Sequence, residues 1–236
     1  MKKFLTIVTT ALIAIAVVSC NSEEKPNNEE VRKLPSRTVE HLFDGELKIE
    51  IEYFYDVRRR LIKIDRRQGE VVHITYNSDD LPIRVERHND WRTDIVYQDN
   101  GKTIILSSVS LFLNPGYLWT DTLWLNDKGQ LIRFKRSKGL NIDKVFSYDS
   151  NGNIATVTGW IGYAEYSDIP SIWRHANIPD WFFYWLWYPN MFVMQPQRSG
   201  YMFSGFYYTL NADNYVTEIK TKDGNIFLEI EYILVN

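Results

Sequence analysis

The stretch Tyr148-Asp149-Ser150-Asn151-Gly152, followed by Ile154 and Val157, decides the fold because its pattern of residue types recurs along the chain. The pattern is an aromatic residue or leucine, then a turn rich in Asp, Asn and Gly, then apolar residues. It also begins at Tyr55, Tyr76, Tyr97, Leu125 and Leu210. The three tyrosines are 21 residues apart, and the next two intervals are 28 and 23 residues. A period of this length is typical of a protein built from one repeated structural unit.

Each part of the repeat has a physical role in a β-hairpin. Asp or Asn at the start of the turn can accept a hydrogen bond from the backbone two residues further on. Gly or Asn adopts the positive φ that tight hairpins require. The tyrosine ends one strand and can pack across to the apolar residue that begins the next strand. A unit of 21 residues therefore holds two short strands and two turns.

The repeats predict an all-β fold, an antiparallel meander of about thirteen strands. Alternation of apolar and polar residues supports this prediction in residues 81–86 and 226–232. A long antiparallel sheet exposes two edges, so we expect the meander to be strongly curved or closed into a barrel. Residues 61–67 are too short and too charged for a membrane-spanning strand, which needs about 9–11 residues with an uncharged lipid face. The sheet is therefore expected to lie outside the bilayer.

The composition argues against a nucleic-acid-binding protein. The chain has 236 residues and a formal charge of −3, and its basic and acidic residues are mixed along every segment. A nucleic-acid surface would require a clustered basic face. Aromatic residues make up 15% of the chain, which favours strands because the pleated surface of a sheet suits large rings.

The N-terminus has the pattern of an export signal. Lys2 and Lys3 precede an apolar stretch from Phe4 to Val18, which is shorter than the about 20 residues of a transmembrane helix. The run Val17-Val18-Ser19-Cys20 follows and resembles the lipobox of bacterial lipoproteins, in which the cysteine is acylated. Cys20 is the only cysteine, so a disulfide within the chain is excluded. We therefore predict a signal peptide at residues 1–19 and a membrane anchor on Cys20.

Residues 20–36 are predicted to be the lipidated cysteine and a flexible tether, because the segment is rich in Glu, Asn and Pro. Asn21-Ser22-Glu23-Glu24-Lys25 also resembles the acidic surface-export signal of Bacteroidota lipoproteins; a plain polar linker is an equal alternative. Residues 37–236 would then form one repeat-built β-meander domain, long enough for a substantial core. The expected location is the cell envelope, lipid-anchored to the outer membrane, with the domain facing the cell exterior if the export signal operates.

The segment 160–200 interrupts the repeats and is predicted to be an aromatic-rich insertion. It holds five of the eight tryptophans. Pro179 suits the first turn of a short helix that runs through Trp187, and Pro189 would end this helix. Because the helix is apolar on all sides, it must be buried or lie against another surface.

Three roles for the insertion stay open. It could be a plug that fills or caps the sheet, an aromatic platform that stacks on sugar rings, or a contact with the nearby membrane. A long insertion in a regular repeat is a common place for function. The glycan hypothesis gives six candidate ligand-binding residues, Trp173, Trp181, Tyr184, Trp185, Trp187 and Tyr188.

The sequence has no recognisable catalytic or metal-binding motif, and we expect no cofactor and no enzymatic activity. Its four histidines, His41, His73, His88 and His175, do not form the helical pair of a zinc site. Neither a Gly-x-Ser-x-Gly nucleophile nor a phosphate-binding glycine loop occurs. Glu165 and Asp168 could flank a sugar as acid and base, but the sequence does not fix their separation. A glycosidase is therefore disfavoured.

The repeated Tyr-Asp unit with its following glycine resembles the YD-type repeats of bacterial surface proteins. Together with the lipobox, it is similar to a family of Bacteroidota lipoproteins of unknown function whose domain is described as porin-like in fold. The resemblance covers about residues 39–233, although the glycine is missing after Tyr55, Tyr76 and Leu210. It implies a β fold and provides no site residues.

Two functional hypotheses follow from the sequence. The first is a non-catalytic surface lipoprotein that binds a glycan or another ligand through the aromatic insertion. The second is a structural or assembly component of the cell envelope that binds another protein.

Overall fold

The computed structural model describes residues 32–42, 47–67, 69–88, 90–112, 115–137, 142–159, 169–186 and 206–235. Residues 31–236 form one compact unit. The described residues contain one α-helix, a short 3-10 turn and fourteen strands. The elements are β1 (Lys33–Leu42), β2 (Leu47–Tyr55), β3 (Leu61–Arg66), β4 (Glu70–Tyr76), β5 (Pro82–Arg87), β6 (Trp91–Gln98), η2 (Asp99–Gly101), β7 (Thr103–Ser110), β8 (Leu118–Leu125), β9 (Leu131–Arg136), β10 (Asp143–Tyr148), β11 (Ile154–Val157), α1 (Asp180–Leu186), β12 (Phe206–Leu210), β13 (Val216–Thr221) and β14 (Ile226–Leu234).

The strands form one antiparallel meander sheet. Neighbouring strands follow the chain from β1 to β11, and β1 also pairs with β14, which continues to β13 and β12. The β1–β14 ladder runs from Lys33 opposite Leu234 to Glu40 opposite Leu228. The predicted all-β meander with a short helix is therefore confirmed, with fourteen strands among the described residues instead of about thirteen.

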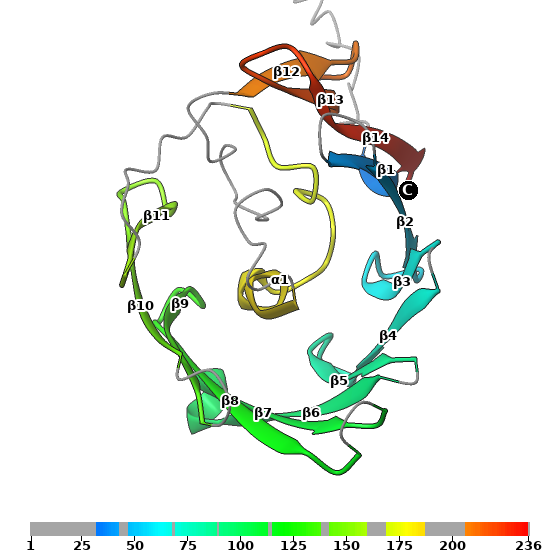
Figure 1. Ribbon diagram of the computed structural model, residues 1–236. Coiled ribbons are helices and arrows are strands. Elements are labelled where there is room, and N and C mark those ends of the chain that lie inside the picture. Colours follow the sequence, from blue (N-terminus) through cyan, green and yellow to red (C-terminus); the bar gives the residue numbers. More distant parts are fainter. Residues whose placement is uncertain are drawn as a thin grey trace, which may run out of the picture. The chain divides into compact units, whose positions relative to one another are not determined.

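The sheet curls around α1 but is not closed (Figure 1). Among the described residues, β11 and β12 end the sheet and are not hydrogen-bonded to each other. The expectation of a closed barrel is thus unsupported. Both edge strands are short, with 4 residues in β11 and 5 in β12, so each offers few unpaired backbone groups to solvent or to another strand.

The first strand begins earlier than the sequence predicts. Lys33 to Ser36, expected to belong to the tether, lie in β1. Leu34 is fully buried, and the carbonyl of Pro35 accepts a hydrogen bond of 2.8 Å from the Tyr55 hydroxyl. These two contacts explain why a segment of mostly polar composition continues the sheet.

The Asp or Asn of the repeat closes five of the six turns with two hydrogen bonds; the turn after Tyr97 is η2 instead. Asn126 Oδ1 accepts from the backbone N–H groups of Lys128 and Gln130, both at 3.0 Å. The fourth residue of the turn has positive φ, as in Gly129 at 76°. The same pair of bonds occurs in the turns that begin at Asp56, Asn77, Asp149 and Asn211. Arg59, Asp80 and Asn214 adopt the positive φ there. The missing glycines therefore do not change the turn.

The tyrosine of the repeat closes a two-strand unit with its hydroxyl. Tyr76 at the end of β4 donates to the carbonyl of Leu61 at the start of β3, at 2.9 Å. Equivalent bonds join Tyr55 to Pro35, Tyr97 to Pro82, Tyr148 to Leu131 and Tyr232 to Val216. These residues lie at the end of the sheet where β1 starts and β14 ends, which we call the tyrosine end. Leu125 ends β8 in the place of a tyrosine.

The core lies on the inner face of the curved sheet. Strand residues such as Ile51, Ile104, Leu123 and Leu228 are fully buried and belong to one cluster with the aromatic residues of α1. Alternate residues of each strand point inward, as the period of a β-strand requires. The described part of the insertion, residues 169–186, is therefore the inner layer of the fold.

Candidate functional site

The outer face of the sheet carries many ion pairs on β1, β2, β3 and β14. Arg37 lies between Glu50 and Glu231 and pairs with both. Arg67, just beyond β3, pairs with Glu50 at 2.7 Å and Glu52 at 2.6 Å. Hydrogen bonding to Glu50 raises the pKa of the Arg37 guanidinium. Opposite charges on neighbouring strands thus satisfy one another across this face.

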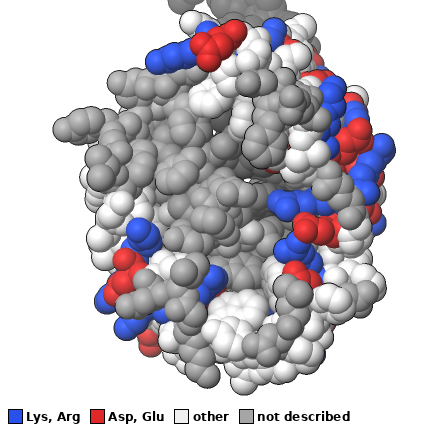
Figure 2. Space-filling model, in the orientation of Figure 1, with Lys and Arg blue, Asp and Glu red and all other residues white. Residues whose placement is uncertain are grey.

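The outer face of β7 and β8 carries no charged side chain. Cross-strand pairs place Thr103 beside Trp124, Ile105 beside Thr122, Ser107 beside Thr120 and Val109 beside Leu118. These eight residues, here called the uncharged face, are exposed or half-buried. Charged residues frame it on both sides, Arg92 and Asp94 on β6 and Arg133 and Lys135 on β9. Figure 2 shows blue and red side chains beside β1–β4 and over β9–β10, and mostly white ones at the bottom, where β6–β8 lie.

Inside the sheet, α1 begins directly after Pro179, as the sequence predicts. The N–H of Phe182 donates to the carbonyl of Pro179 at 3.0 Å. Trp181, Phe182, Phe183, Tyr184 and Trp185 are all buried. A helix that is apolar on all sides is stable only when it is enclosed, and here the sheet encloses it.

Edge-to-face ring contacts join the insertion to widely spaced strands. Trp181 packs on Tyr97 of β6 with ring centroids 6.1 Å apart, and Tyr184 packs on Phe146 of β10 at 4.6 Å. Trp173 packs on Tyr53 of β2 at 4.9 Å. Each such pair contributes about 0.5–1.5 kcal/mol beyond the burial of its area. The insertion therefore ties β2, β6 and β10 together from inside.

A buried carboxylate holds α1 to the sheet. Asp121 of β8 is fully buried, and Arg136 of β9 donates to it from Nε at 2.7 Å and from Nη2 at 2.8 Å. The indole N–H of Trp185 donates to Asp121 Oδ2 at 2.9 Å. A buried charge is tolerated only when it is paired and hydrogen-bonded. Asp121 is the only charged residue between Lys102 and Asp127. It lies two residues before the buried Leu123, so its side chain points to the same inner face of the sheet. This pattern indicates an inward charge, although Asp121 was not among the predicted site residues.

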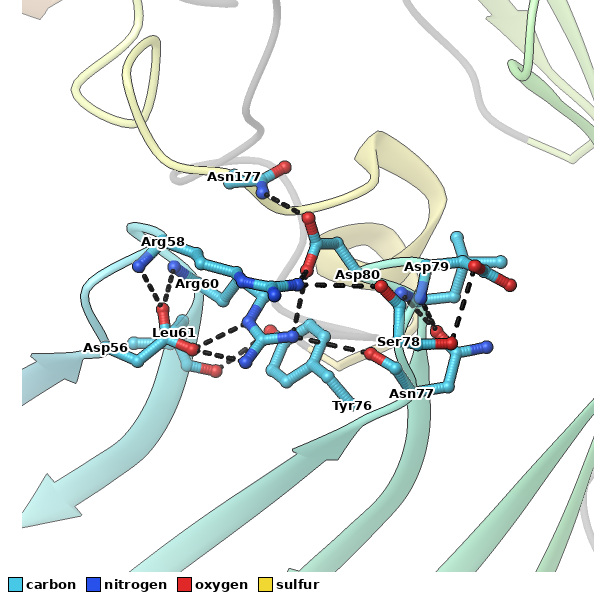
Figure 3. Close-up of polar contacts among 11 residues, drawn as sticks. Asp56, Arg58, Arg60, Leu61, Tyr76, Asn77, Ser78, Asp79, Asp80 and Asn177 are labelled. Carbon is cyan, nitrogen blue, oxygen red and sulfur yellow. Dashed lines mark hydrogen bonds and ion pairs between the residues drawn. The ribbon is translucent and has the colours of Figure 1, made fainter.

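A second polar contact fixes the insertion at the tyrosine end. Asn177 donates its backbone N–H to the carbonyl of Arg59 at 2.9 Å, and its amide lies 3.4 Å from Asp80 Oδ2. Asp80 also accepts from Arg58 and Arg60, both at 2.9 Å (Figure 3). The hydrogen bond from Arg58 lowers the pKa of the Asp80 carboxyl. Arg58, Arg59 and Arg60, which precede β3, therefore help to attach the insertion to the sheet.

The structure brings four of the predicted ligand-binding residues together in the core. Trp173, Trp181, Tyr184 and Trp185 are between 2% and 8% exposed. Their burial fits the plug, because a sugar cannot stack on a ring whose faces are packed against protein. Trp187 and Tyr188 lie outside the described residues, as do Cys20, Glu165 and Asp168. Glycan binding by this set stays a prediction.

The described residues present no grouped chemistry beyond these contacts. No three His, Cys, Asp or Glu side chains in this part of the chain are close enough together to hold a metal ion. His41 contacts Glu229 at 2.6 Å, and His175 contacts Arg174 at 3.1 Å, at separate places in the fold. No helix in the described ranges has the length and apolar character of a membrane span.

No protein-family model matches the chain, and no curated protein matches it closely enough to serve as a relative.

Proposed function

We propose that this protein is a lipid-anchored, non-catalytic component of the cell envelope that binds another protein with the outer face of its sheet. Cys20 carries the anchor in this proposal, and the β domain is the binding part. The observation that carries the proposal is the uncharged face of β7 and β8 between charged neighbours.

The chemistry of this face suits protein binding. The centres of protein interfaces are depleted in charged residues and enriched in aromatic ones, and the rims are polar. Trp124 and Leu118 lie at opposite ends of the uncharged face, with threonine and serine hydroxyls between them. Arg133 lies over the Trp124 ring at 5.2 Å and belongs to the charged rim. The plug supports the backbone from inside, so the face is held in one shape before a partner binds.

The size of the face predicts how far the contact extends. Neighbouring strands are about 4.8 Å apart, so β7 and β8 alone offer a surface about 10 Å wide. Each partner in a standard interface buries about 800 Å². Val96 on β6 lies opposite Ile105 at the edge of the face and is 52% exposed. We therefore expect Val96 to join the interface.

A double charge substitution tests the proposal. Ile105→Lys with Thr122→Lys places two ammonium groups at the centre of the face, and Thr75→Lys on the outer face of β4 is the matched control. Crosslinking in intact cells followed by mass spectrometry would identify the partner of the unaltered protein. We expect the double variant to reduce binding to the purified partner at least tenfold and the control to retain it, because burying an unpaired charge is costly.

Two results would contradict the proposal. One is unchanged partner binding by the double variant. The other is a specific glycan bound by the β domain on an array, which would favour the ligand hypothesis. The anchor is tested separately: Cys20→Ser should abolish incorporation of radioactive palmitate and release the protein from the membrane fraction.

A further inference from the structure

The connection between β7 and β8 exposes a cluster of large apolar side chains. Phe112 is 69% exposed, Leu118 57%, Leu111 48% and Tyr117 39%. These four residues are here called the hairpin tip. The ring centroids of Tyr117 and Trp119 are 6.1 Å apart at its base. Large apolar groups gathered at the end of one hairpin mark a contact surface, whereas single exposed apolar residues do not.

Three backbone N–H groups of the hairpin are hydrogen-bonded within the protein. The N–H of Ser110 donates to the carbonyl of Tyr117 at 2.9 Å, and that of Gly116 donates to Ser110 at 3.0 Å. The N–H of Leu111 donates to the carbonyl of Asp90 in the neighbouring turn at 2.7 Å. In lipid, every unsatisfied backbone group costs several kcal/mol. These three groups are already satisfied within the protein.

The hairpin itself carries no exposed charge. Residues 111–118 contain no charged residue, and the one charge between Lys102 and Asp127 is the buried Asp121. Tyrosine and tryptophan are enriched where a membrane meets water, and Phe and Leu enter its apolar part. Trp119 in β8 at the base of the hairpin and Phe112 in its loop follow this order.

The length of the chain before β1 permits contact with the membrane. The hairpin tip lies at the end of the sheet opposite the tyrosine end, where β1 starts. Eleven residues, 21–31, separate Cys20 from Arg32. A chain of this length spans at most about 40 Å, and a strand of eight residues such as β8 spans about 27 Å. An anchor on Cys20 can therefore hold the opposite end of the sheet at the bilayer.

We propose that the hairpin tip inserts into the interfacial layer of the lipid bilayer and sets the orientation of the domain; this rests on the proposed lipid anchor. Acyl chains on Cys20 keep the protein at the membrane, and the hairpin tip adds a second contact with defined geometry. Strands β7 and β8 then rise from the membrane, and their uncharged face is open to a partner in the same membrane. A partner protein that covers the hairpin tip in place of lipid is the opposing outcome.

Vesicle binding by a chain of residues 21–236 tests this proposal without the anchor. This chain contains the whole compact unit and no cysteine. Phosphatidylcholine vesicles are the probe, because an uncharged tip requires no anionic lipid. We expect co-flotation with the vesicles that 0.5 M NaCl leaves unchanged. Phe112→Ser with Leu118→Ser should weaken binding at least tenfold, and Val57→Ser, at a fully exposed valine of the tyrosine end, should not.

A fluorescent label gives a second measurement on an unaltered tip. Pro115→Cys provides a single thiol beside the hairpin tip, and Val57→Cys provides the control. We expect an environment-sensitive dye at position 115 to shift to the blue with vesicles and to be quenched by spin-labelled lipid, and the dye at position 57 to do neither. Absence of vesicle binding, full binding by the double serine variant, or a signal at position 57 alone would overturn the proposal. Palmitate labelling of Cys20 would be unaffected, so failure here is distinguishable from failure of the anchor.

Discussion

Strands β1–β4 and strands β7–β8 are built from the same repeated unit, yet they present different outer surfaces. The first group covers its outer face with pairs such as Arg37 with Glu50 and Lys63 with Asp65. The second has hydroxyl, aliphatic and indole groups outside and its one carboxylate, Asp121, inside. Tyr55 and Tyr76 close the units of the first group, and Leu125 replaces the tyrosine in the second. The repeat thus specifies the backbone and leaves the outward residues free for function.

The largest expected effect comes from the inward charge of β8. Asp121→Asn leaves the Arg136 guanidinium without its carboxylate, and we expect the free energy of unfolding to fall by about 3–5 kcal/mol. Urea denaturation of the residue 21–236 chain measures the change. Asp143→Asn is the matched control, because Asp143 pairs with Arg133 at an exposed site. A loss below 1 kcal/mol for Asp121→Asn would mean that this ion pair does not hold the plug.

The second largest effect concerns the tyrosine hydroxyl bond, which β3–β4 have and β7–β8 lack because Leu125 replaces the tyrosine. Tyr76→Phe removes the hydroxyl that bonds the carbonyl of Leu61, and we expect a loss of about 1–2 kcal/mol in unfolding free energy. Tyr207→Phe is the control, because Tyr207 is 64% exposed. Burial raises the pKa of the Tyr76 phenol, so the hydroxyl remains a donor above the pH at which an exposed tyrosine ionises. Equal stability of the two variants would show that the hydroxyl bonds do not close the units.

A smaller effect separates the two outer faces directly. We expect Arg37→Ala to cost about 0.5–1 kcal/mol, less in 1 M NaCl, because half-exposed ion pairs are weak and screened by salt. Ile105→Lys on the uncharged face should change stability by less than about 0.5 kcal/mol at any salt concentration. Thermal denaturation in low and high salt compares the two variants. A salt-dependent loss for Ile105→Lys would mean that the uncharged face also serves stability.

The smallest effect is a pH dependence at β1. Burial raises the pKa of the Glu40 carboxyl, and Arg66 partly opposes this. The folded state therefore favours the protonated form, so this group stabilises the fold most at low pH and its contribution falls as the pH rises above about 4.5. We expect Glu40→Gln to stabilise the protein at pH 7 by a few tenths of a kcal/mol. Unfolding measured at pH 4.5 and 7 should show a smaller difference in the variant than in the natural chain.

The sequence predicted the parts of this fold that depend on local chemistry. The Asx turns, the antiparallel meander and the start of α1 after Pro179 all follow from neighbouring residues. The β1–β14 pairing and the role of Asp121 did not emerge, because each depends on residues far apart in the chain. The burial of Trp173 and Trp181 fits the plug, which is one of the three roles that the sequence leaves open for the insertion. Composition alone does not distinguish an aromatic plug from an aromatic platform, since both require the same rings.

The hydroxyl bond of each tyrosine joins two strands of the same unit, with Tyr97 and Pro82 as one example. Among the described residues, no tyrosine hydroxyl bond of this kind reaches into the next unit, and neighbouring units are joined by a turn and by backbone pairing such as that of β4 with β5. Duplication or deletion of a pair of strands would therefore leave the tyrosine hydroxyl bonds of the other pairs intact. A sheet with more or fewer such pairs of strands would then have a larger or smaller circumference.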